Sequence, residues 1–98
     1  MLYVLDGKSF RPAKNMDEFG AMWFGGKRHV AKDIIGEVRV STVFLGLDHG
    51  LGDGPPLLFE TMIFGGQHDQ YQTRASSWTE AEGQHAAALA LVTTAADS

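Results

Sequence analysis

The sequence predicts an α+β fold, with a mainly antiparallel sheet of about four to five strands and two helices, the C-terminal one packed on the sheet. Two strongly apolar, β-type runs at residues 37–47 and 57–64 are joined by a loop rich in Gly, Asp and Pro. A helix start signal at Ser77 precedes a run of small apolar residues, and a shorter helical pattern begins near Asn15. Consecutive strands joined by short loops pair antiparallel, so we expect the last helix to cover their sheet.

The first residues predict a short hairpin. Residues 2–5 have the composition of a strand and end at the turn signal Asp6-Gly7. Residues 9–13 supply the return strand, in which Pro12 is tolerated only at a sheet edge or a strand end.

The first helix is predicted to follow Asn15, a favourable N-cap residue. Asp17 and Glu18 then lie in the first turn, where the helix dipole favours carboxylates. One face carries large apolar side chains at helical spacing: Met16, Phe19, Met22 and Trp23. The glycines at 25–26 end this helix after about ten residues.

The middle of the chain predicts strands. Residues 29–33 form a candidate strand that we expect to break at residues 34–36. In the long run 37–47, one face carries Val38, Val40, Thr42 and Phe44, and the other carries Arg39, Ser41, Val43, Leu45 and Leu47. The first half of this run therefore has one polar face, whereas its second half is apolar on both.

The run at residues 57–64 is apolar on both faces apart from Glu60 and Thr61. Strands of this kind belong in the middle of a sheet or between two layers. Residues 71–76 alternate only weakly, which is typical of an outer strand.

The C-terminal helix is predicted over residues 78–92. Ser77 and Glu80 form a capping box at its start. Its inward stripe at helical spacing consists of Trp78, Ala81, His85, Ala88, Leu89 and Val92. We expect the tail at residues 93–98 to be frayed.

The composition is that of one folded domain, residues 1–98, with 44% hydrophobic and 20% charged residues. We divide it into a hairpin and helix (1–35), a core of sheet and C-terminal helix (36–92) and the tail (93–98). The absence of cysteine excludes disulfides and thiolate chemistry.

Charge and hydropathy narrow the function classes. The net charge is −4, and the basic residues cluster only weakly at 27–32, so nucleic-acid binding is not favoured. No run approaches the ~18 apolar residues of a membrane helix, and the start lacks the pattern of a signal peptide. We therefore expect a cytoplasmic protein that does not interact with membranes.

Glu60 and His85 are the first candidate site. Glu60 is a carboxylate in the most apolar strand, and His85 lies in the apolar stripe of the last helix. If the helix packs on the face of Glu60, the two form a buried pair. Such a pair serves either as an acid–base or metal site or, as we favour, as an internal contact between helix and sheet.

The loop between the two apolar runs is the second candidate, because Asp48, His49 and Asp53 could bind a divalent cation. Their spacing matches neither an EF-hand nor HExxH, and Asp and Gly are also ordinary turn residues. We therefore expect no metal and no cofactor.

Two further segments are candidates for a binding surface. His68, Asp69 and Tyr71 belong to a polar turn and the strand after it, and Trp23 supplies a large aromatic ring on the first helix. No nucleophile motif accompanies any of these residues, so the sequence favours binding over catalysis.

The segments STVFLGLDHG (41–50), GPPLLFETMIFGG (54–66) and SSWTEAEGQH (76–85) closely resemble small proteins of unknown function that bacteriophage and prophage genomes encode. The resemblance covers about residues 36–92, and its signature includes His49, Glu60, Thr61 and His85. It implies a viral accessory protein made in the cytoplasm of the infected or lysogenic bacterial host. It gives none of these residues a role.

Three functions stay open. The first is stoichiometric binding to a host or defence-system macromolecule, as an inhibitor of bacterial immunity would bind, with homodimerisation through an unpaired strand edge as an additional option. The second is sequestration of a small ligand or nucleotide by Arg39 or Arg74 with the glycine loop. The third is a minimal metal-dependent hydrolase that uses Asp48, His49, Asp53 or Glu60.

Overall fold

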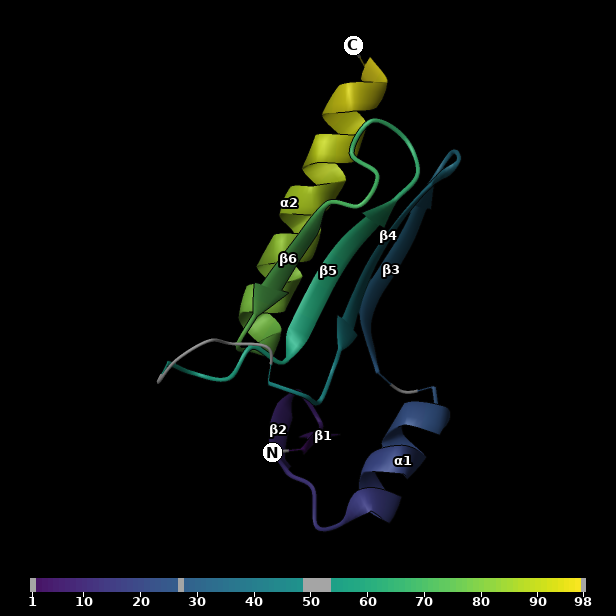
Figure 1. Cartoon of the computed structure of the whole chain (residues 1–98). Helices are drawn as coiled ribbons and strands as arrows, with labels where there is room; N and C mark the ends of the chain where they lie inside the picture. The colour runs from purple at the N-terminus through teal and green to yellow at the C-terminus, as the bar shows by residue number, and fades with distance from the viewer. Residues whose placement is uncertain (1, 27, 49–53, 98) are drawn as a thin grey trace.

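The computed structural model describes residues 2–26, 28–48 and 54–97, and it confirms the predicted fold class. Its elements, in chain order, are β1 (Tyr3–Asp6), β2 (Ser9–Pro12), α1 (Met16–Phe24), β3 (His29–Ile35), β4 (Val38–Phe44), β5 (Phe59–Phe64), β6 (Gln72–Ala75) and α2 (Trp78–Asp97). Strands β3, β4, β5 and β6 form an antiparallel sheet in that order, and β1 and β2 form a separate hairpin (Figure 1).

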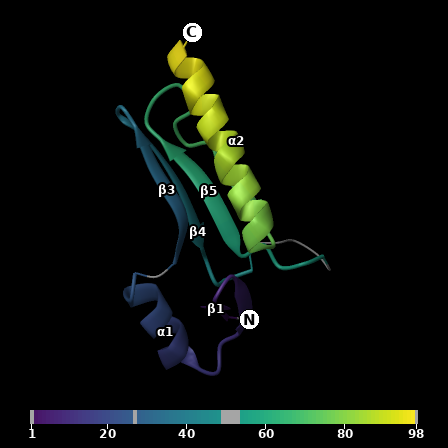
Figure 2. The ribbon, with the colours of Figure 1, turned by 180° about the vertical axis from the view of Figure 1, so that it is seen from behind.

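Helix α2 lies along one face of the four-stranded sheet. It contacts all four strands, and the ribbon views show it behind the sheet from one side and in front of it from the other (Figures 1 and 2). The hairpin and α1 lie at one end of the sheet, whereas the β3–β4 and β5–β6 turns lie at the opposite end. The opposite face of the sheet is not covered by any of the described helices or strands.

Alternation along the two central strands decides which side chains face α2. In β4, Val40, Thr42 and Phe44 are buried, and in β5 the buried residues are Phe59, Thr61 and Ile63. The residues between them face the other way, because successive side chains of a strand point to opposite sides. The central position predicted for both strands is confirmed, whereas a second covering layer is not found among the described residues.

Helix α2 starts at its predicted cap, where the Ser77 hydroxyl accepts from the Glu80 amide at 3.1 Å. Its stripe of Ala81, His85, Ala88 and Val92 is buried, and the two alanines let the helix approach the sheet closely. The helix extends beyond its predicted end at residue 92, because α2 continues to Asp97. Residues 93–97 contain neither Gly nor Pro, the residues that commonly stop a helix.

Strand β3 also differs from its prediction. It does not break at Ile34, which pairs with Arg39, and it ends only after Ile35, which pairs with Val38. The turn is set instead by Gly36, whose φ of +60° is a left-handed conformation that glycine adopts without strain.

The interior consists of two apolar clusters with polar groups between them. The cluster nearer the hairpin contains Phe44, Leu58, Phe59, Ala75 and Ala81, with Tyr3, Leu5 and Phe10 of the hairpin packed against it. The cluster nearer the turns contains Val40, Ile63, Ala88 and Val92. Full burial of a large apolar side chain contributes about 1.5–3 kcal/mol, so both clusters stabilise the packing of α2 on the sheet.

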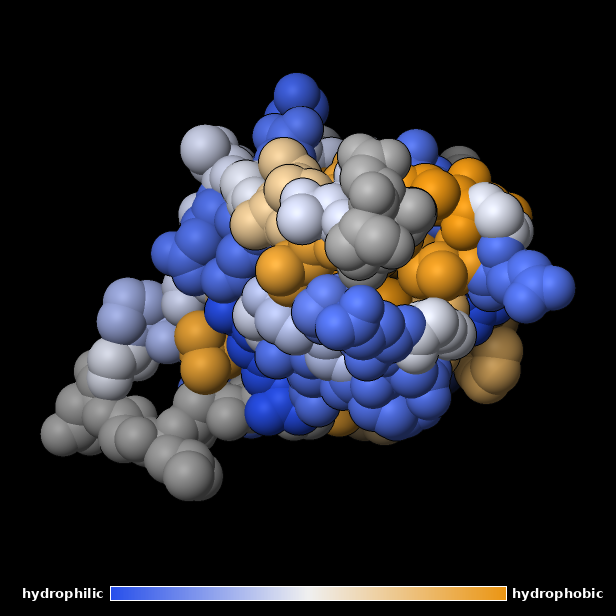
Figure 3. All heavy atoms as spheres, turned by 90° about the horizontal axis from the view of Figure 1, so that it is seen from above, coloured by the Kyte–Doolittle hydropathy of each residue, from blue (hydrophilic) through white to orange (hydrophobic). Residues whose placement is uncertain are grey.

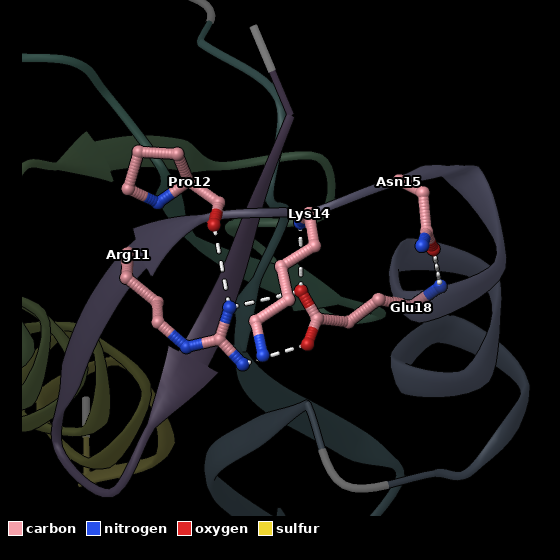
Figure 4. Close-up of polar contacts among 5 residues, drawn as sticks. All are labelled: Arg11, Pro12, Lys14, Asn15 and Glu18. Carbon is pink, nitrogen blue, oxygen red and sulfur yellow. Dashed lines mark hydrogen bonds and ion pairs between the residues drawn. The ribbon is translucent and has the colours of Figure 1, made fainter.

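An ion pair joins the hairpin to α1. The Arg11 guanidinium donates to both carboxylate oxygens of Glu18, at 2.8 and 2.7 Å (Figure 4). The Lys14 amide donates to the same carboxylate, and the Asn15 side chain caps α1 as predicted. The hydrogen bonds from Arg11 and the Lys14 amide lower the pKa of Glu18 to about 2. Because α1 contains no buried residue, this contact is an important constraint on its position.

Candidate functional site

A chain of hydrogen bonds crosses the interior between the two apolar clusters. The hydroxyls of Thr61 and Thr42 are 2.7 Å apart, and the Thr42 hydroxyl lies 2.7 Å from Nδ1 of His85. Nε2 of His85 lies 2.8 Å from Oδ2 of Asp33. The chain thus links β5, β4, α2 and β3, in that order.

The chemistry of the end groups sets the direction of these bonds. The Asp33 carboxylate only accepts, so Nε2 of His85 donates to it. Nδ1 of a neutral ring then accepts from the Thr42 hydroxyl, which in turn accepts from Thr61. In this arrangement every bond in the chain has one donor and one acceptor, as buried polar groups require.

The order hydroxyl, imidazole, carboxylate is also that of a hydrolytic triad. In this protein, however, the Thr42 hydroxyl is inaccessible to solvent. Thr42 and Thr61 are both 0% exposed and His85 is 4% exposed, so no substrate carbonyl can reach the Thr42 oxygen. The only solvent-accessible end is the Asp33 carboxylate, whose side chain is 51% exposed. The arrangement therefore fixes α2 against the sheet and provides no nucleophile.

The predicted pairing of Glu60 with His85 was wrong. Glu60 alternates with Phe59 and Thr61 and so lies on the face that α2 does not cover. Its carboxylate accepts from the Gln72 amide and from Nε of Arg74, the latter at 3.3 Å. His85 was correctly placed in the inward stripe, but its carboxylate partner is Asp33.

The sequence did not identify Asp33 as the partner of His85, because the predicted strand at residues 29–33 ends directly at Asp33. Once β3 runs on to Ile35, Ala31, Asp33 and Ile35 share the face toward α2. A single carboxylate between two apolar residues on that face was the signal that could have identified the partner.

Of the predicted loop site, Asp48 lies within the described residues. Oδ1 of Asp48 accepts from the Leu57 amide at 3.0 Å, which is an ordinary loop contact. His49 and Asp53 lie outside the described residues. Within residues 2–26, 28–48 and 54–97, no three His, Asp or Glu side chains are grouped so that they could hold a metal ion.

The turn after β5 is held by its own side chain, because Oδ1 of Asp69 accepts from the Gly65 amide at 2.6 Å. His68 lines a pocket of about 180 Å³ with Ile35, Val38, Gly65, Gly66, Gln67 and Val92. Seen from this end, hydrophobic surface lies among hydrophilic groups (Figure 3). Tyr71, a predicted interface residue, instead packs against the cluster of Val40 and Ile63.

Trp23 is half-buried and does not offer a free ring. The Arg28 guanidinium lies 3.5 Å from the centre of its ring, and Phe19 packs beside it. Burial lowers the pKa of Arg28. The exposed aromatic residue of this helix is Phe24, at 94%.

The uncovered face of the sheet, which we call the open face, presents three rows of side chains across the strands. The strand pairing places Ile34, Arg39 and Phe64 in the first row, Lys32, Ser41, Met62 and Gln72 in the second, and His29, Val43, Glu60 and Arg74 in the third. Val43, Met62 and Phe64 are only half-buried, and Ile34 is 68% exposed.

The charges on the open face differ from those of the whole chain. The face carries three cations, Lys32, Arg39 and Arg74, but only one carboxylate, that of Glu60, in a chain of net charge −4. The open face thus combines partly exposed apolar side chains with excess positive charge. The sequence showed only the alternation in the long run at 37–47, because the strand order decides which residues become neighbours.

Comparisons with protein-family models, with curated proteins and with solved structures found no significant match to this chain. Among the described residues, no helix has the length and apolar character needed to span a membrane.

Proposed function

We propose that this chain is a phage-type accessory protein that acts by stoichiometric binding to a host or defence-system macromolecule, without catalysis. The open face is the observation that carries this proposal. Its residues are those of a binding surface rather than of a solvated sheet, because the apolar side chains of Ile34, Val43, Met62 and Phe64 are interspersed with Lys32, Arg39 and Arg74. The resemblance to phage and prophage proteins supplies the biological setting.

The sealed interior supports the same proposal. Thr42 and His85 hold the hydroxyl and imidazole positions of the triad-like order, and both are enclosed between α2 and the sheet. The side chains that remain accessible on the open face are suited to contacts rather than to bond cleavage.

The alternative of nucleotide sequestration receives less support. Arg39 and Arg74 do share the open face, but they lie in its first and third rows. The pocket at the turn end holds about 180 Å³, less than the roughly 300–1,000 Å³ of typical small-molecule sites. The metal-dependent hydrolase has no supporting cluster within the described part of the chain.

A homodimer through a sheet edge remains a further proposal. Strand β3 is the longer edge, and it carries Lys32 and Asp33 in its middle, as edge strands protected against pairing often do. The other edge, β6, has four residues. The charged residues of β3 and the shortness of β6 therefore favour the open face over the edges as the principal contact surface.

The test is affinity capture from host cells followed by measurement of the mass of the reconstituted complex. Ile34→Asp places a charge on the open face, and Met16→Asp is a matched control on α1, because the two side chains are 68% and 67% exposed. We expect the wild type and Met16→Asp to form a complex of fixed ratio, and Ile34→Asp to bind at least about tenfold more weakly.

Two results would contradict the proposal. One is a purified protein that turns over a substrate while no complex of fixed ratio can be reconstituted. The other is an equal loss of binding in Ile34→Asp and Met16→Asp, since that would place the contact elsewhere or make it nonspecific.

A further inference from the structure

We infer that the open face binds an acidic, extended protein segment whose carboxylates alternate with apolar side chains. This inference rests on the proposed function and specifies the chemistry of the partner. It is carried by two cations, Arg39 and Lys32, and by the apolar side chains next to them.

Arg39 is arranged to receive a carboxylate. Its guanidinium lies 4.4 Å from the centre of the Phe64 ring, which keeps the planar group on the surface of the sheet. A guanidinium held in this way loses less conformational freedom when it forms two parallel hydrogen bonds to a carboxylate. In the described part of the structure no carboxylate forms an ion pair with Arg39, including that of Glu37 in the adjoining turn.

Lys32 adds a second cation next to Arg39. It pairs with Ser41, which is two residues from Arg39 on the same face, so the two cations are diagonal neighbours across β3 and β4. Like Arg39, Lys32 forms no ion pair with any carboxylate of the described residues. The third cation, Arg74, is already bound to Glu60. The unpaired positive charge is therefore concentrated in the first two rows.

The apolar side chains of these rows complete the site. Ile34 and Phe64 flank Arg39 within the first row, and Met62 lies beside Ser41 in the second. A partner segment that lies across the strands in an extended conformation turns every second side chain toward the sheet. If carboxylate and apolar residues alternate at those positions of the partner, the carboxylates can reach Lys32 and Arg39 while the apolar residues contact the apolar side chains beside them.

A nucleic acid fits these features less well. Single-stranded nucleic acids bind to exposed aromatic rings along a continuous positive groove. On this face Phe64 is the single aromatic residue, and Arg39 already covers its ring.

The experiment uses fluorescein-labelled peptides and fluorescence anisotropy. The probe is a repeat of Glu-Ser-Leu-Ser, which turns Glu and Leu alternately to one side when it is extended. The comparison ligands are a Gln-Ser-Leu-Ser repeat without charge, a Glu-Ser-Ser-Ser repeat without apolar residues, and oligothymidylate. We expect the full chain to bind the probe more tightly than all three.

Variants of the two cations locate the contact. The double variant Lys32→Gln/Arg39→Gln is expected to bind the probe at least about tenfold more weakly. Arg39→Lys keeps the charge but removes the bidentate contact, so it should also weaken binding. Lys8→Gln removes a cation from the β1–β2 turn and should bind as the wild type does. Thermal unfolding of each variant verifies that it is folded.

Failure of the inference can be separated from failure of the proposed function. The inference is overturned if no peptide binds, if oligothymidylate binds more tightly than the probe, or if the double variant binds as Lys8→Gln does. If the reconstituted complex also persists in the double variant but is lost in Ile34→Asp, the proposed function stands and only the acidic partner is rejected. If no complex of fixed ratio forms at all, the proposed function itself is rejected.

Discussion

Replacement of Thr42 by Val tests whether the buried hydrogen-bond chain stabilises the protein. Thr42 is fully buried, and Val has nearly the same shape, so the substitution opens no large cavity. It removes the hydroxyl that contacts both Thr61 and His85, and so it leaves two buried polar groups without these partners. Each unsatisfied group costs about 1–3 kcal/mol, so the two together predict a loss of about 2–6 kcal/mol in the free energy of unfolding.

A second replacement should recover part of this loss. In Thr42→Val/Thr61→Val the unpaired hydroxyl of Thr61 is gone, and only Nδ1 of His85 is left without its partner. The double variant should therefore be more stable than Thr42→Val alone by about 1–3 kcal/mol. Thr73→Val is the matched control, because the buried Thr73 hydroxyl has no hydrogen-bond partner among the described residues. We expect that control to be as stable as the wild type or slightly more stable.

Equilibrium unfolding in urea measures all four proteins, with a shift of midpoint at constant slope as the sign of changed stability. At about 4–8 °C per kcal/mol for a domain of this size, thermal unfolding gives an independent and easily resolved readout. The reasoning is refuted if Thr42→Val lies within about 0.5 kcal/mol of Thr73→Val. It is refuted equally if the double variant is less stable than the single one.

Four further outcomes are expected. The folded pKa of Glu18 is about 2, below its ordinary 4.5, so the stabilisation from its carboxylate is complete above pH 4.5 and is lost as the pH falls toward 2. The wild type should therefore lose more stability over that interval than Glu18→Gln, and equal losses would contradict the contact. Nitrogen NMR should show the neutral ring of His85 with its proton on Nε2, and a proton on Nδ1 would reverse our assignment. Glu60→Gln should cost at most about 1 kcal/mol in urea unfolding, since the ion pair with Arg74 lies on the open face and is partly exposed, whereas a loss of several kcal/mol would contradict this placement. Gly46→Ala should destabilise the protein by at least about 2 kcal/mol, because φ is +77° and the new Cβ would lie 2.7 Å from Cε2 of Phe19; unchanged thermal unfolding would show that this junction can relax.

The elements themselves were predictable because their signals are local. The N-cap at Asn15 and the capping box at Ser77 are formed by neighbours in sequence, and both are present in the structure. Alternation assigned the two faces of β4 correctly, and the helical stripe placed His85 inside. The predicted end of β3 was two residues too early, because Ile34 and Ile35 still pair with β4 and only Gly36, the last residue of the predicted break, belongs to the turn.

The contacts between elements were not predictable in the same way. Residues 57–64 are apolar on both faces, so the sequence could not show whether Glu60 or Thr61 faces α2. That choice depends on the pairing of β5 with β4, and it moves every side chain of the strand to one face or the other.

The sequence by itself therefore determined the order of the elements, the inward position of His85 and the lack of cysteine chemistry. Only the tertiary structure decided that His85 joins Asp33 instead of Glu60, and that Lys32, Arg39 and Phe64 become neighbours on an uncovered face. The physical reason is range: caps, turns and periodicity act within a few residues, whereas strand pairing and helix docking bring together groups that are tens of residues apart.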